Sequence, residues 1–299
     1  MLGHFPAPYP DELLYSACAR FAVRAGYASV KSVLDELFGA PTATAVIDLP
    51  NRLGFLAAAL PANSSLTAAR LIDQHTLLPF FSAYQPVSRV EQLHEDLKSN
   101  HGPAGHMRSG VMASRIPMPG HLRFCPLCKQ KDEESFGEAY WHRMHQLPGV
   151  EVCSPHQAFL EKSGVSLRAD RRHLQFISAE QVTRMIPVRH VDIEDRNHRA
   201  LLQIAQDAQW VLEHSSAGTS LKALHMRYLR LLIKRGLATY TGNIHVKKLL
   251  NKFSGLYSPS LLKLLNCELR GRDLEKANWL LRLVRPFTIC CSSSSSATP

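Results

Sequence analysis

Apolar residues recur every three to four positions through most of the first hundred residues, and this spacing predicts amphipathic helices. We expect one helix to begin at Asp11 and Glu12 and to end at Gly26, because glycine readily adopts the left-handed backbone of a helix end. Ser29 is a good N-cap for a second helix, which Gly39 ends. The N-terminal part of the chain is therefore predicted to be helical.

Two further helices are expected in this part of the chain. Ser65 is placed to cap one that Pro79 stops, and the other covers residues 88–98. Short helices with tight connections predict a helix-turn-helix-like domain over residues 1–118, although a small helical bundle of another kind fits nearly as well. Residues 100–120 are rich in Gly, Pro and Ser, which predicts a linker.

The last third of the chain also shows helical spacing, and capping or breaking residues mark four expected helices. These are a helix from Asp195, a helix over 220–235 before Gly236, a helix over 243–253 before Gly255, and a helix that Ser258 and Pro259 begin. Helix, short turn and helix is the order of a DNA-binding helix-turn-helix, so we predict a helical domain of this kind over residues 190–288. The serine run that follows predicts a disordered tail over residues 289–299.

Positive charge is concentrated in this C-terminal part. The whole chain has a net charge of +10, but residues 219–286 alone hold fourteen lysines and arginines against three acids. A concentrated positive field is typical of proteins that bind a polyanion such as nucleic acid, and a solvated basic surface is the alternative. If this domain binds duplex DNA, the lysines that we expect to contact phosphates are Lys247, Lys248, Lys252 and Lys263.

Composition and missing motifs exclude several classes of protein. No apolar run reaches the roughly 18 residues of a membrane span, and no basic segment followed by an apolar one opens the chain, so we expect an intracellular protein. In a reducing compartment, the seven cysteines favour a metal site over disulfides. The sequence has no G-x-x-x-x-G-K-[ST] and no H-E-x-x-H, so neither a nucleotide-phosphate loop nor that catalytic zinc motif is predicted.

Two pairs of metal-ligating residues have the spacing of a structural zinc site. Cys125 and Cys128 are separated by two residues, and so are Cys153 and His156, so one tight turn can direct both members of a pair to one ion. Together they form a closed tetrahedral Cys3His set, which leaves no position for a catalytic water. We therefore predict one structural zinc ion per chain, held by a small zinc-ribbon-like module over residues 119–175, and no catalytic residues.

Two other histidines leave the identity of the fourth ligand open. His142 and His145 lie between the two pairs and could replace His156. We prefer His156 because its pairing with Cys153 is local, and we expect the other two to pack, to donate hydrogen bonds beside the site, or to face DNA.

Several stretches of sequence carry a family pattern. Those around the ligands read FCP (124–126), GEAYWHR (137–143), HQLPGV (145–150) and CSPH (153–156). They resemble the TniQ family of transposition target-selection proteins. The opening FPAPYPDELLYS (5–16) and HTLLP (75–79) look like the TnsD branch of that family, and the resemblance covers most of residues 5–285.

The resemblance implies a non-catalytic protein that marks a DNA target for a transposon in the bacterial cytoplasm. TnsD-type members bind a chromosomal attachment site directly, other TniQ members dock as dimers on a CRISPR Cascade RNA-guided complex, and both recruit an AAA+ regulator of the TnsC type. The zinc ligands carry over to Cys125, Cys128, Cys153 and His156. Members of the TnsD branch usually continue beyond this length, so we expect a truncated or diverged end here.

Three functions therefore remain in view. The TnsD-like opening favours an adaptor that binds attachment-site DNA and recruits the regulator, and the alternative is an adaptor that docks on Cascade. A zinc-dependent nuclease or hydrolase is a third hypothesis, and it would require an open metal position with a base beside it.

Overall fold

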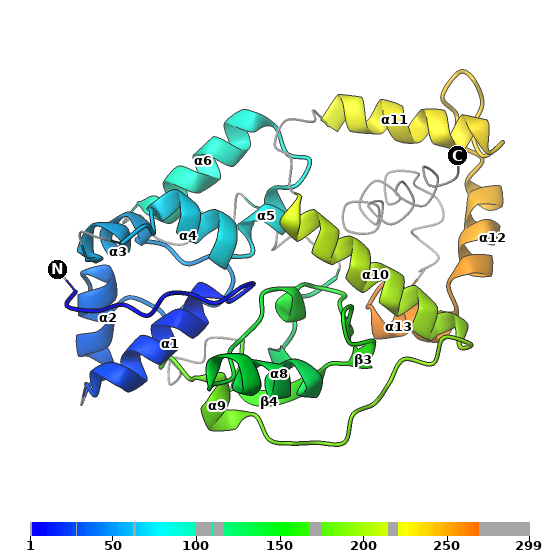
Figure 1. Cartoon of the computed structure of the whole chain (residues 1–299). Coiled ribbons are helices and arrows are strands. Elements are labelled where there is room, and N and C mark those ends of the chain that lie inside the picture. The colour runs from blue at the N-terminus through cyan, green and yellow to red at the C-terminus, as the bar shows by residue number, and fades with distance from the viewer. Residues whose placement is uncertain are drawn as a thin grey trace.

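Helices make up most of the structure, and the few strands lie next to the predicted metal ligands (Figure 1). The computed structural model describes residues 2–27, 29–61, 64–99, 109, 116–167, 175–214 and 221–268. The N-terminal helices are α1 (Leu14–Ala25), α2 (Val30–Phe38), α3 (Leu53–Ala59), α4 (Ala68–His75), α5 (Leu78–Ser82) and α6 (Val87–Lys98). They are followed by α8 (Pro126–Phe136), the 3-10 turn η2 (Met144–Gln146), α9 (Ala179–Val182), α10 (Arg196–Glu213), α11 (Leu221–Lys234), α12 (Val246–Leu256) and α13 (Pro259–Leu264).

The strands of the described residues form two small antiparallel sheets. β1 (His121–Phe124) pairs with β4 (Glu161–Ser166), and β2 (Val152–Cys153) pairs with β3 (Ala158–Phe159). Both sheets belong to the segment that carries the cysteine pairs. The predicted fold class, mainly α with a small module at the cysteines, is therefore confirmed.

The N-terminal helices follow the predicted periodicity, but two of them begin later than expected. α1 begins after Asp11 rather than at it, because Asp11 has a left-handed backbone (φ 56°) and joins the chain to residues of the cysteine-bearing segment. The predicted end at Gly26 is confirmed. The expectation that Ser65 caps the helix before Pro79 is wrong. That helix, α4, begins after Thr67, whose hydroxyl accepts a hydrogen bond from the amide of Arg70.

Two short helices in this region were not predicted. α3 has seven residues and lacks a capping side chain, so little in the sequence marks it. α5 holds Pro79 in its first turn, where the missing amide hydrogen costs nothing. Pro79, which we expected only to stop a helix, therefore also helps to begin one.

The C-terminal helices show one clear error in the prediction. α10 begins as expected, with the Asp195 carboxylate accepting hydrogen bonds from the amides of Asn197 and His198. Gly255 does not break a helix, because it lies inside α12, which continues to Leu256. The break comes instead before Ser258, whose hydroxyl caps α13 as the sequence predicted.

One hydrophobic core runs through the N-terminal helices, the cysteine-bearing segment, α10 and α13. Trp141, in the middle of the chain, is completely buried in it, and its carbonyl accepts a hydrogen bond from the amide of Leu13 at 2.9 Å. Its indole donates a hydrogen bond to the carbonyl of Ile177, and its backbone amide bonds the hydroxyl of Ser16. The module at the cysteines is thus packed against helices on both sides (Figure 1).

The helices α11 and α12 contribute less to that core. Leu250 is the one side chain of α12 that is buried, and the described side chains of α11 are half-buried or exposed. In Figure 1 both helices lie at the edge of the molecule, away from α1 and α2. Within the described residues, no helix is both long and apolar enough to cross a membrane.

Asp195 gives a direct test of how α10 is anchored. Replacing Asp195 with alanine removes the acceptor for two first-turn amides, so we expect the free energy of unfolding to fall and the midpoint of unfolding to move to a lower urea concentration. Urea denaturation of the full chain would measure the change. Glu194→Ala, an exposed carboxylate one residue earlier, is the matched control and should change stability by less than half as much; equal losses in both variants would contradict the capping role.

Candidate metal centre

The two ligand pairs lie where strands end. β1 delivers Cys125 to the N-cap position of α8, and Cys128 follows in the first turn of that helix. Cys153 ends β2, and the turn to β3 carries His156. That turn includes Gln157 with a left-handed backbone (φ 47°), which lets the hairpin close sharply enough for the two side chains to converge.

The sequence pattern did not predict the helix α8, which begins directly after Cys125 and ends before Gly137. A helix at this position matters chemically, because amide groups of its first turn and the helix dipole stabilise a thiolate at its N-terminus.

The four predicted ligands converge, and their spacing fits a tetrahedral metal ion. The ligating atoms of Cys125, Cys128, Cys153 and His156 all lie within 4.8 Å of one another. The Nδ1 atom of His156 is 3.7, 3.2 and 3.6 Å from the sulfurs of Cys125, Cys128 and Cys153, and the last two sulfurs are 3.6 Å apart. Around a tetrahedral ion with bonds of about 2.0–2.3 Å, neighbouring ligand atoms are about 3.5–3.8 Å apart.

The electrostatics of the thiols also call for a cation. The three cysteine side chains are buried and the imidazole is partly buried. Hydrogen bonds from Cys128 and Cys153 lower the pKa of Cys125, whereas the pKa of Cys153 is raised to about 12 and that of Cys128 also rises, chiefly through their contacts with the Cys125 thiolate. The cluster alone therefore favours one thiolate, and a bound divalent cation would favour the loss of the other two protons.

His145 lies beside this cluster rather than in it. Its Nε2 atom is 3.7 Å from the sulfur of Cys128, and its ring is completely buried. Burial, together with the nearby charge of His142, lowers the pKa of His145 to about 3, so the ring is neutral. A neutral ring can direct an N–H toward the Cys128 sulfur, which agrees with the expected hydrogen-bonding role and not with facing DNA.

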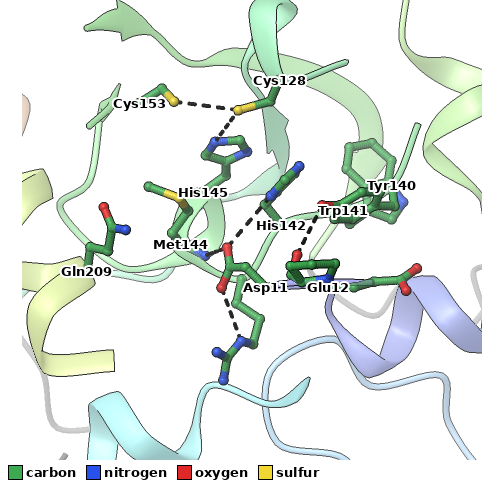
Figure 2. A network of polar contacts seen from close by, with 12 residues as sticks. Asp11, Glu12, Cys128, Tyr140, Trp141, His142, Met144, His145, Cys153 and Gln209 are labelled. Atoms are coloured by element: carbon green, nitrogen blue, oxygen red, sulfur yellow. Dashed lines mark hydrogen bonds and ion pairs between the residues drawn. The ribbon is translucent and has the colours of Figure 1, made fainter. Parts of the chain in front are cut away.

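His142 connects the cluster to the N-terminal segment (Figure 2). Its Nε2 atom is 2.8 Å from a carboxylate oxygen of Asp132 on α8, and its Nδ1 atom is 3.7 Å from Asp11. Burial alone would lower the pKa of His142, but hydrogen bonds with Asp11 and Asp132 raise it to about 9. The imidazolium therefore joins two carboxylates that come from different parts of the chain.

Asp11 is the centre of this junction. Its carboxylate accepts hydrogen bonds from Nε of Arg143 at 3.2 Å and from the amide of Met144 at 3.1 Å, while its carbonyl accepts from the amide of Arg143 at 2.8 Å. Burial opposes ionisation of Asp11, yet the bond with His142 and the charge of Arg143 lower its pKa. The same guanidinium also donates to the carbonyls of Asp73 and Thr76 at the end of α4.

A second ion-pair group, Tyr9, Glu12, Arg20 and Glu138, strengthens the same interface. The guanidinium of Arg20 bonds both oxygens of the buried Glu12 carboxylate, at 2.9 and 2.7 Å. It also reaches Glu138 at 3.1 Å and lies 3.9 Å from the centre of the Tyr9 ring. Tyr9 in turn donates a hydrogen bond to Glu138, so the opening segment is held to the cysteine module by charge as well as by packing.

Sequence reasoning missed these junction residues, namely Asp11, Glu12, Arg20, Asp132 and Arg143. The stretches 5–16 and 137–143 were noted only as a family pattern, without a role for each side chain. The signal that could have found them is the charged residues that stand inside otherwise apolar and aromatic runs, because a buried charge requires a partner.

The four lysines predicted to contact phosphates are all exposed, but they are not equivalent. Lys247, Lys248 and Lys252 lie on α12. Helical spacing places Lys248 and Lys252 opposite the buried Leu250, and Lys247 lies beside Asn251, between them and Leu250. Lys263 lies on α13, whose other face is buried. The structure therefore assembles three of the four on one open helix face.

The other four cysteines lie outside the cluster, and two of them, like the predicted tail and most of the predicted linker, fall outside the described residues. Cys290, Cys291 and the predicted tail over 289–299 are not among the described residues, nor are most residues of the predicted linker. Cys18 and Cys267 are single buried thiols of the core.

Comparison with known proteins gives separate matches for the N-terminal and the C-terminal parts of the chain. The model of the TniQ family matches residues 4–160, which include the N-terminal helices and all four ligands, and the model of the family "Tn7-like transposition protein D" matches residues 204–288. Transposon Tn7 transposition protein TnsD of Escherichia coli is 34% identical over 159 residues. Those residues cover 53% of this chain and 31% of that protein, so the match spans less than a third of the relative's length.

The junction at His142 predicts a pH-dependent contribution to stability. A histidine whose folded-state pKa of about 9 exceeds the ordinary 6.5 stabilises the fold fully below pH 6.5, and this contribution is lost as the pH rises to 9. Asp132→Asn removes one partner, so we expect it to lower the free energy of unfolding by about 2 kcal/mol at pH 6.5 and by much less at pH 9.5.

Urea denaturation at several pH values would measure this difference. Glu134→Gln makes the same carboxylate-to-amide change at an exposed position of α8 and serves as the control, with a small effect at every pH. A loss in Asp132→Asn that does not change between pH 6.5 and pH 9.5 would show that charge on His142 is not the cause.

Proposed function

This chain belongs to the TniQ family, and from that premise we propose that it is a target-selection adaptor of a transposon, which binds duplex DNA and recruits an AAA+ regulator of the TnsC type. The relationship to the TnsD branch supports the transposon role. Because the curated relative is matched over only 31% of its length, DNA binding and recruitment of the regulator are proposals for this chain.

The lysine face of α12 carries the DNA-binding part of the proposal. Between residues 221 and 268 the chain has nine lysines and arginines and one acid, Glu268. Lys247, Lys248 and Lys252 point away from the core on a helix with one buried side chain, so the helix can approach a groove closely. A helix with its side chains is about 10–12 Å wide, which matches the DNA major groove of about 12 Å.

α12 and α13 also have the connectivity of a helix-turn-helix. Two residues separate them, Tyr257 and Ser258, and α13 packs into the body through Leu261 and Leu262. We propose that α13 supports the motif and that α12 enters the major groove, with Lys263 contacting the backbone beside it. The adaptor would thus act at the bacterial chromosome, within the nucleoid.

We further propose that the Cys3His cluster holds one structural zinc ion per chain. Sulfur and imidazole donors at tetrahedral spacing are the preferred environment of Zn²⁺. With four protein ligands, the ion has no open position for a water or substrate, so its role is to fix the module against the helices on either side. The protein is accordingly proposed to be non-catalytic.

Metal analysis distinguishes the ligands from their neighbours. His156→Ala and Cys153→Ser each remove a ligand, so we expect the zinc content of the purified chain to fall well below one per chain and the chain to lose thermal stability. His145→Gln removes a partner of the Cys128 sulfur, so it should keep one zinc but bind it about 10–100-fold more weakly in competition with a chelator.

Cys18→Ala, a buried thiol outside the cluster, is the control and should retain its zinc. Full zinc content in His156→Ala together with none in His145→Gln would show that His145 is the fourth ligand. DNA cleavage that disappears with the zinc would instead favour the hydrolase hypothesis.

Salt dependence tests the proposed DNA contacts. Each phosphate neutralised by a lysine contributes about 0.9 to the slope of log affinity against log salt, so Lys247→Ala, Lys248→Ala and Lys252→Ala together should lower the slope by about 3. Fluorescence anisotropy on 30-base-pair duplexes tiled from bacterial genomes, at several salt concentrations, would measure it.

Lys31→Ala and Lys162→Ala alter exposed lysines elsewhere and should leave the slope unchanged. If the wild-type chain binds every duplex weakly and equally, the direct-recognition role is contradicted. Dimerisation and copurification with Cascade would then favour the RNA-guided alternative.

A further inference from the structure

A tight hairpin protrudes between α11 and α12, at the upper right of Figure 1. Ala238 and Ile244 pair in an isolated antiparallel bridge, and the amide of Thr239 donates to the carbonyl of Asn243 at 2.8 Å. The amide of Gly242 donates back to the carbonyl of Thr239 at 3.0 Å, which closes a turn with Tyr240 and Thr241 at its corner. Residues 237–245, which we call the hairpin, thus end in a narrow tip.

Backbone hydrogen bonds join the base of the hairpin to the helix before it, because the amide of Leu237 donates to the carbonyl of Leu232 at 2.8 Å. Gly242 has a φ of 93°, a left-handed backbone that favours glycine, and it lies near Leu229 of α11. The hydroxyl of Thr239 accepts from the amide of Asn243 at 3.0 Å and lies 2.7 Å from the hydroxyl of Thr241. These bonds fix the tip before any partner binds.

Tyr240 occupies the end of that tip and is 94% exposed. Among the residues that the structure describes, the other exposed large apolar side chains are between 37% and 67% accessible, so Tyr240 has the largest exposed fraction of this group. A flat ring with a terminal hydroxyl can pack against a deoxyribose and a base edge while its hydroxyl reaches a polar atom.

Charge around the hairpin identifies the kind of partner. Arg235 precedes it, and Lys247 and Lys248 follow it on the open face of α12, with His245 at the junction. An exposed ring flanked by cations on both sides suits a polyanion with apolar surfaces between its charges, which is the chemistry of nucleic acid.

The dimensions select the groove. The minor groove of B-DNA is about 6 Å wide, which admits a turn but not a helix, whereas the major groove accepts α12. Adjacent major and minor grooves are about half of a 34 Å helical turn apart, or roughly 17 Å. From its base at Leu237 and His245 to Tyr240, the hairpin projects three residues, or roughly 10 Å at about 3.3 Å per residue, and the tyrosine side chain extends this reach toward the neighbouring groove while α12 stays in its own.

We propose that the hairpin is a second DNA-contacting element, and that Tyr240 enters the minor groove next to the major groove occupied by α12. The inference rests on the proposed DNA-binding function and deepens it by naming a residue for groove contact and the groove that it reads. An aromatic wedge in a minor groove contributes through packing and local deformation of the duplex rather than through release of counterions.

The test uses the full chain, its tightest-binding duplex from the tiled set, and netropsin as a minor-groove competitor. Tyr240→Ala should bind that duplex about tenfold more weakly with an unchanged salt slope, and netropsin should no longer compete with it. Tyr240→Phe and Tyr240→Trp should keep most of the affinity. Phe55→Ala, an aromatic on α3 that is 42% exposed, is the control for a general loss of surface area.

Three results would overturn the inference in different ways. If Tyr240→Ala binds like the wild type while the triple lysine variant is weakened, the DNA-binding function stands and the tip is not part of it. If the wild-type chain binds no duplex even at low salt, the proposed function fails and the inference fails with it. A Tyr240→Ala variant that binds DNA normally but loses the AAA+ regulator would assign the tip to a protein partner.

Discussion

Three thiols packed around one imidazole create a constraint that the rest of the structure has to satisfy. Their sulfurs and the His156 nitrogen converge from a helix start and a hairpin turn that lie far apart in the sequence. Without a cation, the cluster favours a single thiolate, and mutual repulsion opposes the geometry needed for all four ligands. Closing this cluster also closes the loop over residues 129–152, and that loop carries Glu138, His142 and Arg143, whose charged contacts hold the N-terminal segment.

The loop does so with charge placed inside a hydrophobic core. Trp141 provides the packing, while His142 and Arg143 use Asp11 as a common partner. Buried ionic groups are costly unless their partners are fixed, so this junction specifies one docking geometry more than it adds stability. In Figure 2, dashed lines join Cys153 to Cys128, Cys128 to His145, and His142 to Asp11. The rings of His145 and His142 connect the two parts, with their centres 4.9 Å apart. The metal cluster and the opening of the chain are therefore one structural unit.

Local features were predictable from sequence, and long-range ones were not. Helical periodicity gave α1, α2, α6 and α10–α13, and the capping residues Asp195 and Ser258 were identified correctly because capping is decided within one turn. The ligand spacing identified a cluster whose members do converge. In contrast, the left-handed backbone of Asp11 depends on partners more than a hundred residues away, which no local pattern in the sequence could supply. Gly255 was misjudged for a local reason, because one glycine weakens a helix only modestly and does not have to end it.

The way in which α12 is supported has a mechanical consequence. The helix packs on the core through Leu250, with Val246 and Phe253 partly buried beside it. Its C-terminal end leads to α13, and the hydroxyl of Ser258, which caps α13, bonds Asn197 at the start of α10. α10 in turn lies against η2 and β2 at the cysteine cluster. A force applied to α12 would therefore be transmitted through Ser258 and α10 to the part of the chain that holds the cluster.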